Sequence, residues 1–405
     1  MFNVLSRLAD MKLPPIGRLF SWGPILILSI MGFLTYMVFY FVEMWWVPSQ
    51  SVGGMVHITV YCITTLSSLC WFLTASFTGP GRVPRGWTPP NEAAVEYLQY
   101  CNTCKAYKAP RSLHCKKCGF CVKKLDHHCP WINICVGHDN HLYFAIFLTF
   151  TLLACFQAAI VVTTCLYHAI NRGWYIQQGL QPVISLSSSR LMLTMFATGL
   201  AVGAVVAAVF LLHGQLTGFI KNFTEIEGWV LEKAKYRRRA AGLPAFVYPY
   251  DMGWKENLKL LLARDFDGLW WPVRKGCSPK EMMDEQKAQK KDRESRFFVC
   301  NVSDEYDGAR VPLAAYPRAA LAPPLSLAPR LPLRLGDCVR VLVDGPQWMF
   351  GVKLTTEGQE TGKRGWFPRA AVYTEEDLED AQIDAQTDTQ THTITNALTV
   401  KTKSA

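Results

Sequence analysis

The sequence predicts a mainly α membrane protein with a cysteine-rich insert and a small β module near the C-terminal end. Three observations predict it: four long apolar runs, a cluster of cysteines and histidines between the second and third runs, and a late β-prone stretch bounded by turns. Half of the 405 residues are hydrophobic, and the formal net charge is +10. We interpret this charge as a topology signal and as attraction to anionic lipid headgroups, and we expect no nucleic-acid partner.

The four apolar runs predict transmembrane helices. They contain no Asp, Glu, Lys or Arg and lie at 23–42, 55–77, 143–170 and 191–220. A helix needs about 20 apolar residues to cross the hydrocarbon core, so each run is long enough. A helix of a soluble protein seldom stays apolar on every face over such a length. We therefore expect a four-helix membrane unit at 1–222.

The distribution of Lys and Arg predicts the orientation of the helices, because cytosolic loops are enriched in both. The loop 43–54 has none and the loop 171–190 has two, whereas the loop 78–142 has nine. Six more follow the last run, at 221–239. Both termini and the cysteine-rich loop are thus predicted to be cytosolic. Since the cytosol is reducing, the cysteines are expected to bind metal or to act in catalysis.

The insert at 95–145 predicts two structural zinc ions. It holds seven of the fourteen cysteines. Two C-x2-C pairs, the commonest sequence signature of zinc, are completed by two histidines and two further cysteines to two sets of four ligands. The eight predicted ligands are Cys101, Cys104, His114, Cys115, Cys118, Cys121, His128 and Cys135.

Three side chains of the tetrad at 126–129 remain outside these sets: Asp126, His127 and Cys129. A nucleophilic thiol needs a base to take its proton, and the base needs an orienting carboxylate. The tetrad supplies all three, so we predict Cys129 as nucleophile, His127 as base and Asp126 as orienter. A further set of zinc ligands and a structurally satisfied histidine pair remain as alternatives. A soluble zinc finger that binds nucleic acid is disfavoured by the flanking spans.

The insert resembles the full signature of the DHHC protein S-acyltransferases, a family of palmitoyltransferases. The matching string is Cys101-x2-Cys104-x9-His114-Cys115-x2-Cys118-x2-Cys121-x4-Asp126-His127-His128-Cys129-Pro130-Trp131-x-Asn133-x-Cys135-Val136-Gly137-x2-Asn140-x3-Phe144. The resemblance implies that four membrane helices enclose a cavity for a fatty acyl chain, above a domain held by two zinc ions. It assigns Cys101, Cys104, His114 and Cys121 to one ion, and Cys115, Cys118, His128 and Cys135 to the other. It also implies that Trp131 and Phe144 line the active site.

The resemblance continues outside the insert with changes. Gly79-Pro80-Gly81 stands where the family usually has Asp-Pro-Gly, and Thr224-Glu225-Ile226-Glu227 stands where it has Thr-Thr-x-Glu. The second threonine is expected near the catalytic aspartate, and two carboxylates close together repel or raise one pKa. We therefore expect Glu225 to turn away or activity to be altered. The residues that support the family motifs are Asn133, Asn140, Thr224, Glu227 and Asn257, the last after a similar C-terminal element at 248–253.

The remaining sequence predicts three parts. Residues 223–296 form a membrane-proximal cytosolic segment that opens with an amphipathic basic stretch. Residues 297–373 resemble an SH3 domain, a small β-barrel, through Leu335-Gly336-Asp337, Trp348 and Gly365-Trp366-Phe367-Pro368, with a Pro/Ala-rich interruption. This combination is similar to the SH3-containing member of the family. Because Ala371 stands at an expected groove tyrosine, the module is either a site for a protein partner or a packing and regulatory element.

The tail at 374–405 is acidic, then rich in Thr and Gln, and is predicted to be disordered. Its Lys401 and Lys403 resemble a dilysine retrieval signal, which predicts a multi-pass protein of the endoplasmic reticulum membrane.

Together these features predict an enzyme, a protein-cysteine S-palmitoyltransferase. Cys129 would take a palmitoyl group from palmitoyl-CoA and pass it to cysteines of substrate proteins at the cytosolic membrane face. Burial of the chain would contribute about 0.8 kcal/mol per methylene, which favours long chains. The alternative is a catalytically impaired membrane adaptor that acts through the SH3-like module. A zinc-regulated transporter is disfavoured because the spans contain no charged residue.

Overall fold

The computed structural model describes residues 15–263, 265–309, 312, 315–321, 323–324, 326 and 328–373. It divides into two units, Met1–Gln286 and Lys287–Ala405, which are described separately. The predicted disordered tail, with its Lys401 and Lys403 signal, lies outside the described residues.

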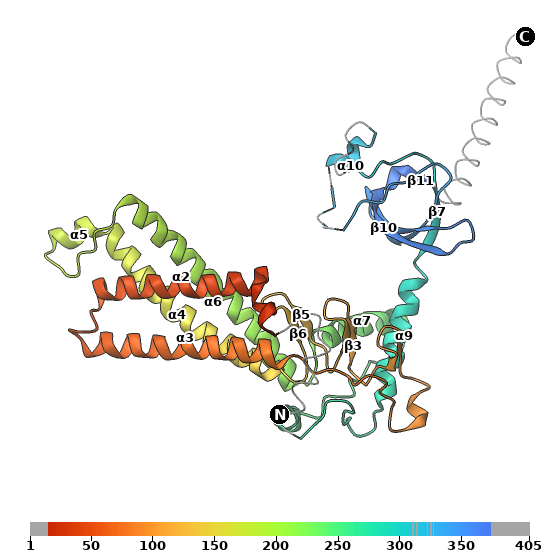
Figure 1. Ribbon diagram of the computed structural model, residues 1–405, viewed down its shortest axis with the longest axis horizontal. Coiled ribbons are helices and arrows are strands. Elements are labelled where there is room, and N and C mark those ends of the chain that lie inside the picture. The colour runs from red at the N-terminus through yellow and green to blue at the C-terminus, as the bar shows by residue number, and fades with distance from the viewer. Residues whose placement is uncertain are drawn as a thin grey trace, which may run out of the picture. The chain divides into compact units, whose positions relative to one another are not determined.

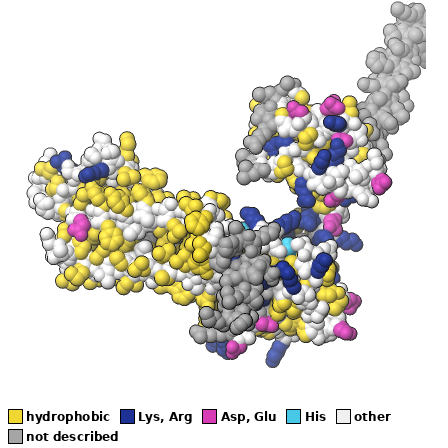
Figure 2. All heavy atoms as spheres, in the orientation of Figure 1, with side chains coloured by type: hydrophobic (Ala, Val, Ile, Leu, Met, Phe, Trp, Pro, Cys, Tyr) yellow, Lys and Arg dark blue, Asp and Glu magenta, His cyan; other side chains and the backbone are white. Residues whose placement is uncertain are grey.

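Four long helices form the membrane part of the first unit and confirm the four predicted spans (Figure 1). They are α2 (Trp22–Trp45), α3 (Val52–Thr78), α4 (His141–Ile170) and α6 (Ser188–Ile220). A 3-10 helix η1 (Pro15–Phe20) precedes α2, and α5 (Arg172–Gln177) follows α4. Helix α4 packs against α2, α3 and α6. The face of these helices that Figure 2 shows carries many hydrophobic side chains and few charged ones, as lipid contact requires.

The core between the helices is apolar and closely packed. Phe41, Val161, Val162, Ala197 and Ala201 have almost no exposed surface. Small residues of α6 thus let it approach α4 closely, a common device between membrane helices.

The cysteine-rich insert consists of three two-stranded antiparallel hairpins. They are β1 (Tyr100–Cys101) with β2 (Ala106–Tyr107), β3 (Leu113–Cys115) with β4 (Phe120–Val122), and β5 (His127–Cys129) with β6 (Ile134–Val136), after a 3-10 helix η2 (Glu92–Ala94). The insert meets the segment that follows α3 at Gly137, where a Cβ would lie 2.7 Å from the backbone oxygen of Pro80. A residue without a side chain therefore permits this close approach.

Three helices follow the last span: α7 (Glu225–Ala240), α8 (Trp254–Leu262) and α9 (Pro279–Glu294). The basic stretch predicted to be amphipathic lies within α7. Tyr250, Trp271, Met282 and Met283 form a buried cluster in this part of the unit. The boundary between the two units falls within α9, inside the segment predicted at 223–296.

The second unit is built on one five-stranded antiparallel sheet in the order β10-β9-β8-β7-β11. Its elements are β7 (Phe298–Val302), α10 (Pro317–Leu321), β8 (Cys338–Val343), β9 (Trp348–Leu354), β10 (Glu360–Pro368), a 3-10 helix η3 (Arg369–Ala371) and β11 (Val372–Tyr373). The predicted β-rich module is therefore present. Its closure into an SH3-like barrel is not confirmed, because the edge strands β10 and β11 are not paired with each other in the described sheet.

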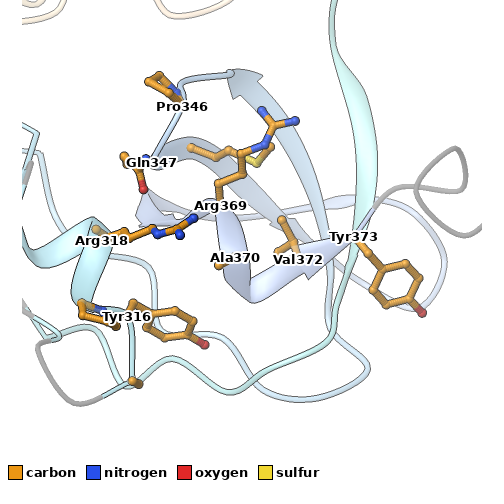
Figure 3. A pocket seen from close by; sticks show the side chains of 12 residues that line it. Tyr316, Arg318, Pro346, Gln347, Arg369, Ala370, Val372 and Tyr373 are labelled. Atoms are coloured by element: carbon orange, nitrogen blue, oxygen red, sulfur yellow. The ribbon is translucent and has the colours of Figure 1, made fainter. Parts of the chain in front are cut away.

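A cavity of about 530 Å³ lies beside η3 and α10 (Figure 3). Tyr316, Arg318, Gln347 and Arg369 are among the side chains that line it. Trp348 itself is buried, and its indole N–H donates to the carbonyl oxygen of Ala319 at 2.8 Å, within the unit. Since proline-rich ligands dock on exposed aromatic side chains, the predicted SH3-mediated partner gains no support here.

Candidate active site and metal clusters

The first Cys/His cluster joins the first two hairpins. The pairing of β3 with β4 places His114 opposite Cys121, and the turn after β1 adds Cys104 to Cys101. The Nδ1 atom of His114 lies 3.5, 3.3 and 3.9 Å from the Sγ atoms of Cys101, Cys104 and Cys121. Four potential ligand atoms therefore converge on one point.

The second cluster joins the last two hairpins in the same way. The pairing of β5 with β6 places His128 opposite Cys135. The Nδ1 atom of His128 lies 3.6, 3.5 and 3.5 Å from the Sγ atoms of Cys115, Cys118 and Cys135. Neighbouring residues on β3, His114 and Cys115, serve different clusters because successive side chains of a strand point to opposite faces.

Both clusters fit a zinc ion. Zn–S bonds of about 2.3 Å and Zn–N bonds of about 2.0 Å in a tetrahedron place ligand atoms about 3.5–3.8 Å apart, close to the distances observed. The hydrogen bond between Cys118 and Cys135 lowers the pKa of Cys118 to about 4 and raises the pKa of Cys135. A divalent cation would allow all three thiols of this cluster to be thiolates together.

Two residues of the predicted catalytic trio, His127 and Cys129, lie on the opposite face of β5 from the second cluster, and Asp126 directly precedes the strand. His127 and Cys129 flank the cluster residue His128 in sequence, so strand alternation places them together. The Nδ1 atom of His127 lies 2.8 Å from Oδ2 of Asp126. Burial lowers the pKa of His127, but hydrogen bonds to Asp126 and Cys129 outweigh burial and raise the pKa to about 10. The trio therefore places a hydrogen-bonded imidazole–carboxylate pair beside the Cys129 side chain, which is 1% exposed.

Asp126 is held by groups from three helices. Its Oδ1 accepts the backbone N–H of Glu225 in α7 at 2.6 Å, and its Oδ2 accepts Nε2 of Gln215 in α6 at 3.2 Å. Nε2 of His141 in α4 lies 3.9 Å from the same Oδ2 and 2.6 Å from Oε1 of Gln215. Burial raises the pKa of Asp126, but the bonds to His127 and the nearby His141 hold it well below its usual range.

The sequence predicted that Glu225 would either turn away from Asp126 or alter activity. The structure shows that the backbone N–H of Glu225, rather than its side chain, meets the aspartate. The side chain is exposed, yet its carboxylate remains within 4.8 Å of the ligand atoms of Asp126 and His127. The carboxylate has thus turned toward solvent without leaving the site.

The start of α7 is fixed by a capping box. Oγ1 of Thr224 accepts the N–H of Glu227 at 3.2 Å, and Oε2 of Glu227 accepts the N–H of Thr224 at 2.9 Å. The carboxylate of Glu227 also receives two hydrogen bonds from Arg111, at 2.8 and 2.6 Å. Because the N–H of Glu225 lies within this turn, the cap and the ion pair together position the donor to Asp126.

Arg111 links the insert to the segments after the spans. Its remaining N–H groups reach the side chain and the carbonyl oxygen of Asn222 at 3.0 and 2.7 Å. Its guanidinium lies 4.4 Å from the ring centre of Trp271 and 4.7 Å from that of Tyr250. We call Arg111, Glu227 and Asn222 the Arg111 network. Sequence analysis missed Arg111, Gln215 and His141, because their partners lie far away along the chain and no local spacing marks them.

The other predicted residues surround the trio or support its frame. Phe144 packs edge to face on His127 with ring centres 5.6 Å apart, and Trp131 packs on Trp22 at 5.4 Å. Three asparagines donate to backbone carbonyl oxygens: Asn133 to Arg18, Asn140 to Ala75 and Cys135, and Asn257 to Ile220 at the end of α6. These asparagines thus brace the insert and the end of the last span.

Comparison with known proteins points to one family. The model of the DHHC palmitoyltransferase family matches residues 94–232. Palmitoyltransferase ZDHHC6 of Mus musculus is 37% identical over 383 residues, which cover 89% of this chain and 92% of that protein. Palmitoyltransferase ZDHHC6 of Danio rerio is 36% identical over 392 residues, covering 91% and 95%. Probable protein S-acyltransferase 15 of Arabidopsis thaliana is 29% identical over 242 residues, covering 58% and 89%.

Proposed function

Because this chain belongs to the DHHC palmitoyltransferase family and is a protein S-acyltransferase, we propose that Cys129 is the thiol that carries the acyl group. His127 would hold the proton and Asp126 would orient the imidazole. The observation that supports these roles is the 2.8 Å bond from His127 to Asp126, next to a thiol that neither metal cluster includes. Because the chain is a protein S-acyltransferase, the alternative of a catalytically impaired membrane adaptor is not favoured.

The reaction has two steps, with palmitoyl-CoA proposed as the donor. In the first step His127 holds the proton of Cys129, and the Cys129 sulfur attacks the thioester carbon. The bond from this carbon to the CoA sulfur breaks, and the CoA sulfur takes the proton from His127. An acceptor cysteine then attacks the same carbon. Its proton passes to His127, and the bond to Cys129 breaks. The acceptors are proposed to be cysteines of proteins at the cytosolic membrane face.

The surroundings of Cys129 suit a fatty acyl chain. Cys129 shares a buried cluster with Phe72 of α3 and with Phe144, Phe147 and Leu148 of α4, at the end of the membrane helices. A chain that leaves the thioester carbon along these side chains would exchange water for apolar contacts. The direct test is to incubate the purified full-length protein, in lipid nanodiscs, with labelled palmitoyl-CoA and to map the hydroxylamine-sensitive label by mass spectrometry. The label is expected on Cys129.

We further propose that the two clusters hold structural zinc. Bound zinc would supply the positive charge that lets three thiolates and an imidazole share each cluster. The ligand residues of the two clusters come from all three hairpins, so they hold the hairpins together. They thereby fix the position of β5, which carries His127 and Cys129.

Replacement Cys118→Ser is expected to lower the zinc content from about two ions per chain to at most one and to unfold the insert. The serine hydroxyl is a poor zinc ligand, and the ligand atoms of this cluster all lie within 4.8 Å of one another, so loss of the ion leaves them crowded. Zinc content and thermal unfolding of the purified protein measure both effects. Cys277→Ser, outside both clusters, is the matched control and should change neither. Two retained ions in Cys118→Ser would refute the assignment of Cys118.

We also propose that the protein is a multi-pass protein of the endoplasmic reticulum membrane with both termini in the cytosol. The excess of Lys and Arg in the loop 78–142 over the loop 43–54 supports the orientation. The location rests on the resemblance of Lys401 and Lys403 to a retrieval signal. Protease protection of tags placed at 48 and at 90 in microsomes tests the orientation, because only the second tag should be cleaved.

A further inference from the structure

Glu225 places a carboxylate beside the catalytic trio. It is the first residue of α7, and its backbone N–H is bonded to Asp126 at 2.6 Å. This bond fixes the Cα position of Glu225 relative to the reacting residues. From there its exposed carboxylate lies within 4.8 Å of a nitrogen of His127 and of an oxygen of Asp126.

Glu225 differs from Asp126 and Glu227 in its pairing. Asp126 is paired with His127, and Glu227 is paired with Arg111. The carboxylate of Glu225 has no hydrogen bond or ion pair with any described residue. The exposed side of the trio therefore carries a second carboxylate, in addition to the Asp126 carboxylate that His127 pairs with.

The acceptor cysteine has to approach from this exposed side. On its other side Cys129 is enclosed by Phe72, Phe144 and Phe147, where the acyl chain would lie. The residues that flank the acceptor cysteine thus pass close to Glu225. Cytosolic segments next to a membrane are rich in Lys and Arg, whose long side chains can reach a carboxylate at such a distance.

Building on the proposed function of Cys129, we propose that Glu225 selects acceptor cysteines that are flanked by lysine or arginine. Glu225 acts here as a specificity-determining residue of the second step. An exposed ion pair of this kind changes relative rates by about two- to fivefold. Salt should weaken the preference, since the Debye length falls from about 10 Å at 0.1 M to about 3 Å at 1 M.

The experiment compares two acceptor peptides with the full-length protein in nanodiscs that contain only zwitterionic lipid. Both peptides carry an N-terminal myristoyl group and one cysteine, which is flanked by lysines in one peptide and by glutamates in the other. The ratio of the two kcat/KM values is measured for the natural protein and for Glu225→Gln, Glu225→Thr and Glu225→Lys. Glu232→Gln is the matched control, because Glu232 lies on the same helix, is 69% exposed and pairs with Lys235.

The natural protein is expected to prefer the lysine-flanked peptide. Glu225→Gln and Glu225→Thr should lower the ratio about two- to fivefold, Glu225→Lys should lower it further, and Glu232→Gln should leave it unchanged. The proposal is overturned if the ratio is the same in all variants, or if Glu225→Gln slows both peptides equally. Failure of the proposed function looks different: the natural protein would acylate neither peptide, or transfer would survive Cys129→Ser. Zinc content and acyl label on each variant show that it is folded.

Discussion

Cys129→Ser is expected to abolish both the hydroxylamine-sensitive acyl-enzyme and the acylation of acceptor cysteines, with a loss of at least about 10³-fold. A serine hydroxyl is close in size to the thiol but is a much weaker nucleophile near neutral pH. Cys129 belongs to neither metal cluster, so the fold and the zinc content should persist. Labelling with a fatty-acyl probe, together with zinc analysis of the same sample, measures the two properties separately.

Cys135→Ser is the informative comparison, since this thiol lies on the strand paired with β5 but belongs to the second cluster. It should lose zinc and label together. Retained labelling in Cys129→Ser would mean that another residue is the nucleophile. Loss of zinc in Cys129→Ser would mean that this thiol is a metal ligand.

Arg111→Met is expected to destabilise the protein by about 3–5 kcal/mol and to lower the rate of acyl-enzyme formation. The substitution leaves the buried carboxylate of Glu227 without its partner, which is the costly way to break a buried ion pair. It also frees the first turn of α7, in which the backbone N–H of Glu225 donates to Asp126. Denaturant unfolding in detergent measures the first effect, and single-turnover labelling measures the second.

The double variant Arg111→Met/Glu227→Gln separates charge burial from simple packing loss. Because the double variant removes both charges, it should be more stable than Arg111→Met alone. If the two substitutions acted independently, their destabilising effects would add instead. Lys235→Met provides a control on the same helix. Its partner Glu232 and Lys235 itself are both 69% exposed, so the change should cost less than about 1 kcal/mol. Equal costs for Arg111→Met and Lys235→Met would contradict the role of the Arg111 network.

The membrane helices could be predicted because uncharged runs of this length are rare outside membrane spans. Only the ends of the helices differ from the predicted runs. Helix α6 begins at Ser188 and α4 at His141, before the apolar runs, because polar residues that the runs excluded occupy their first turns. The two ligand sets could be proposed from the C-x2-C spacing, and their division came from the family resemblance. The structure brings the same two sets together.

The frame of the catalytic trio could not be predicted in this way. The partners Arg111 and Glu227 are separated by 116 residues, and Gln215 and Asp126 by 89. Such contacts depend on how α6 and α7 pack on the insert, which no local pattern encodes. The C-terminal module shows the same limit, because alternating β-prone runs indicated strands but did not determine how the sheet ends.

The alternation along β5 has one more consequence. His128 belongs to the second Cys/His cluster, while His127 and Cys129, its two neighbours in sequence, lie on the other face of the strand. Three consecutive residues thus share one strand, so a change in the cluster on one face should shift the proposed nucleophile and base on the other. Specific activity across preparations should therefore track occupancy of that cluster, and apoprotein should behave as inert protein rather than as a slower enzyme.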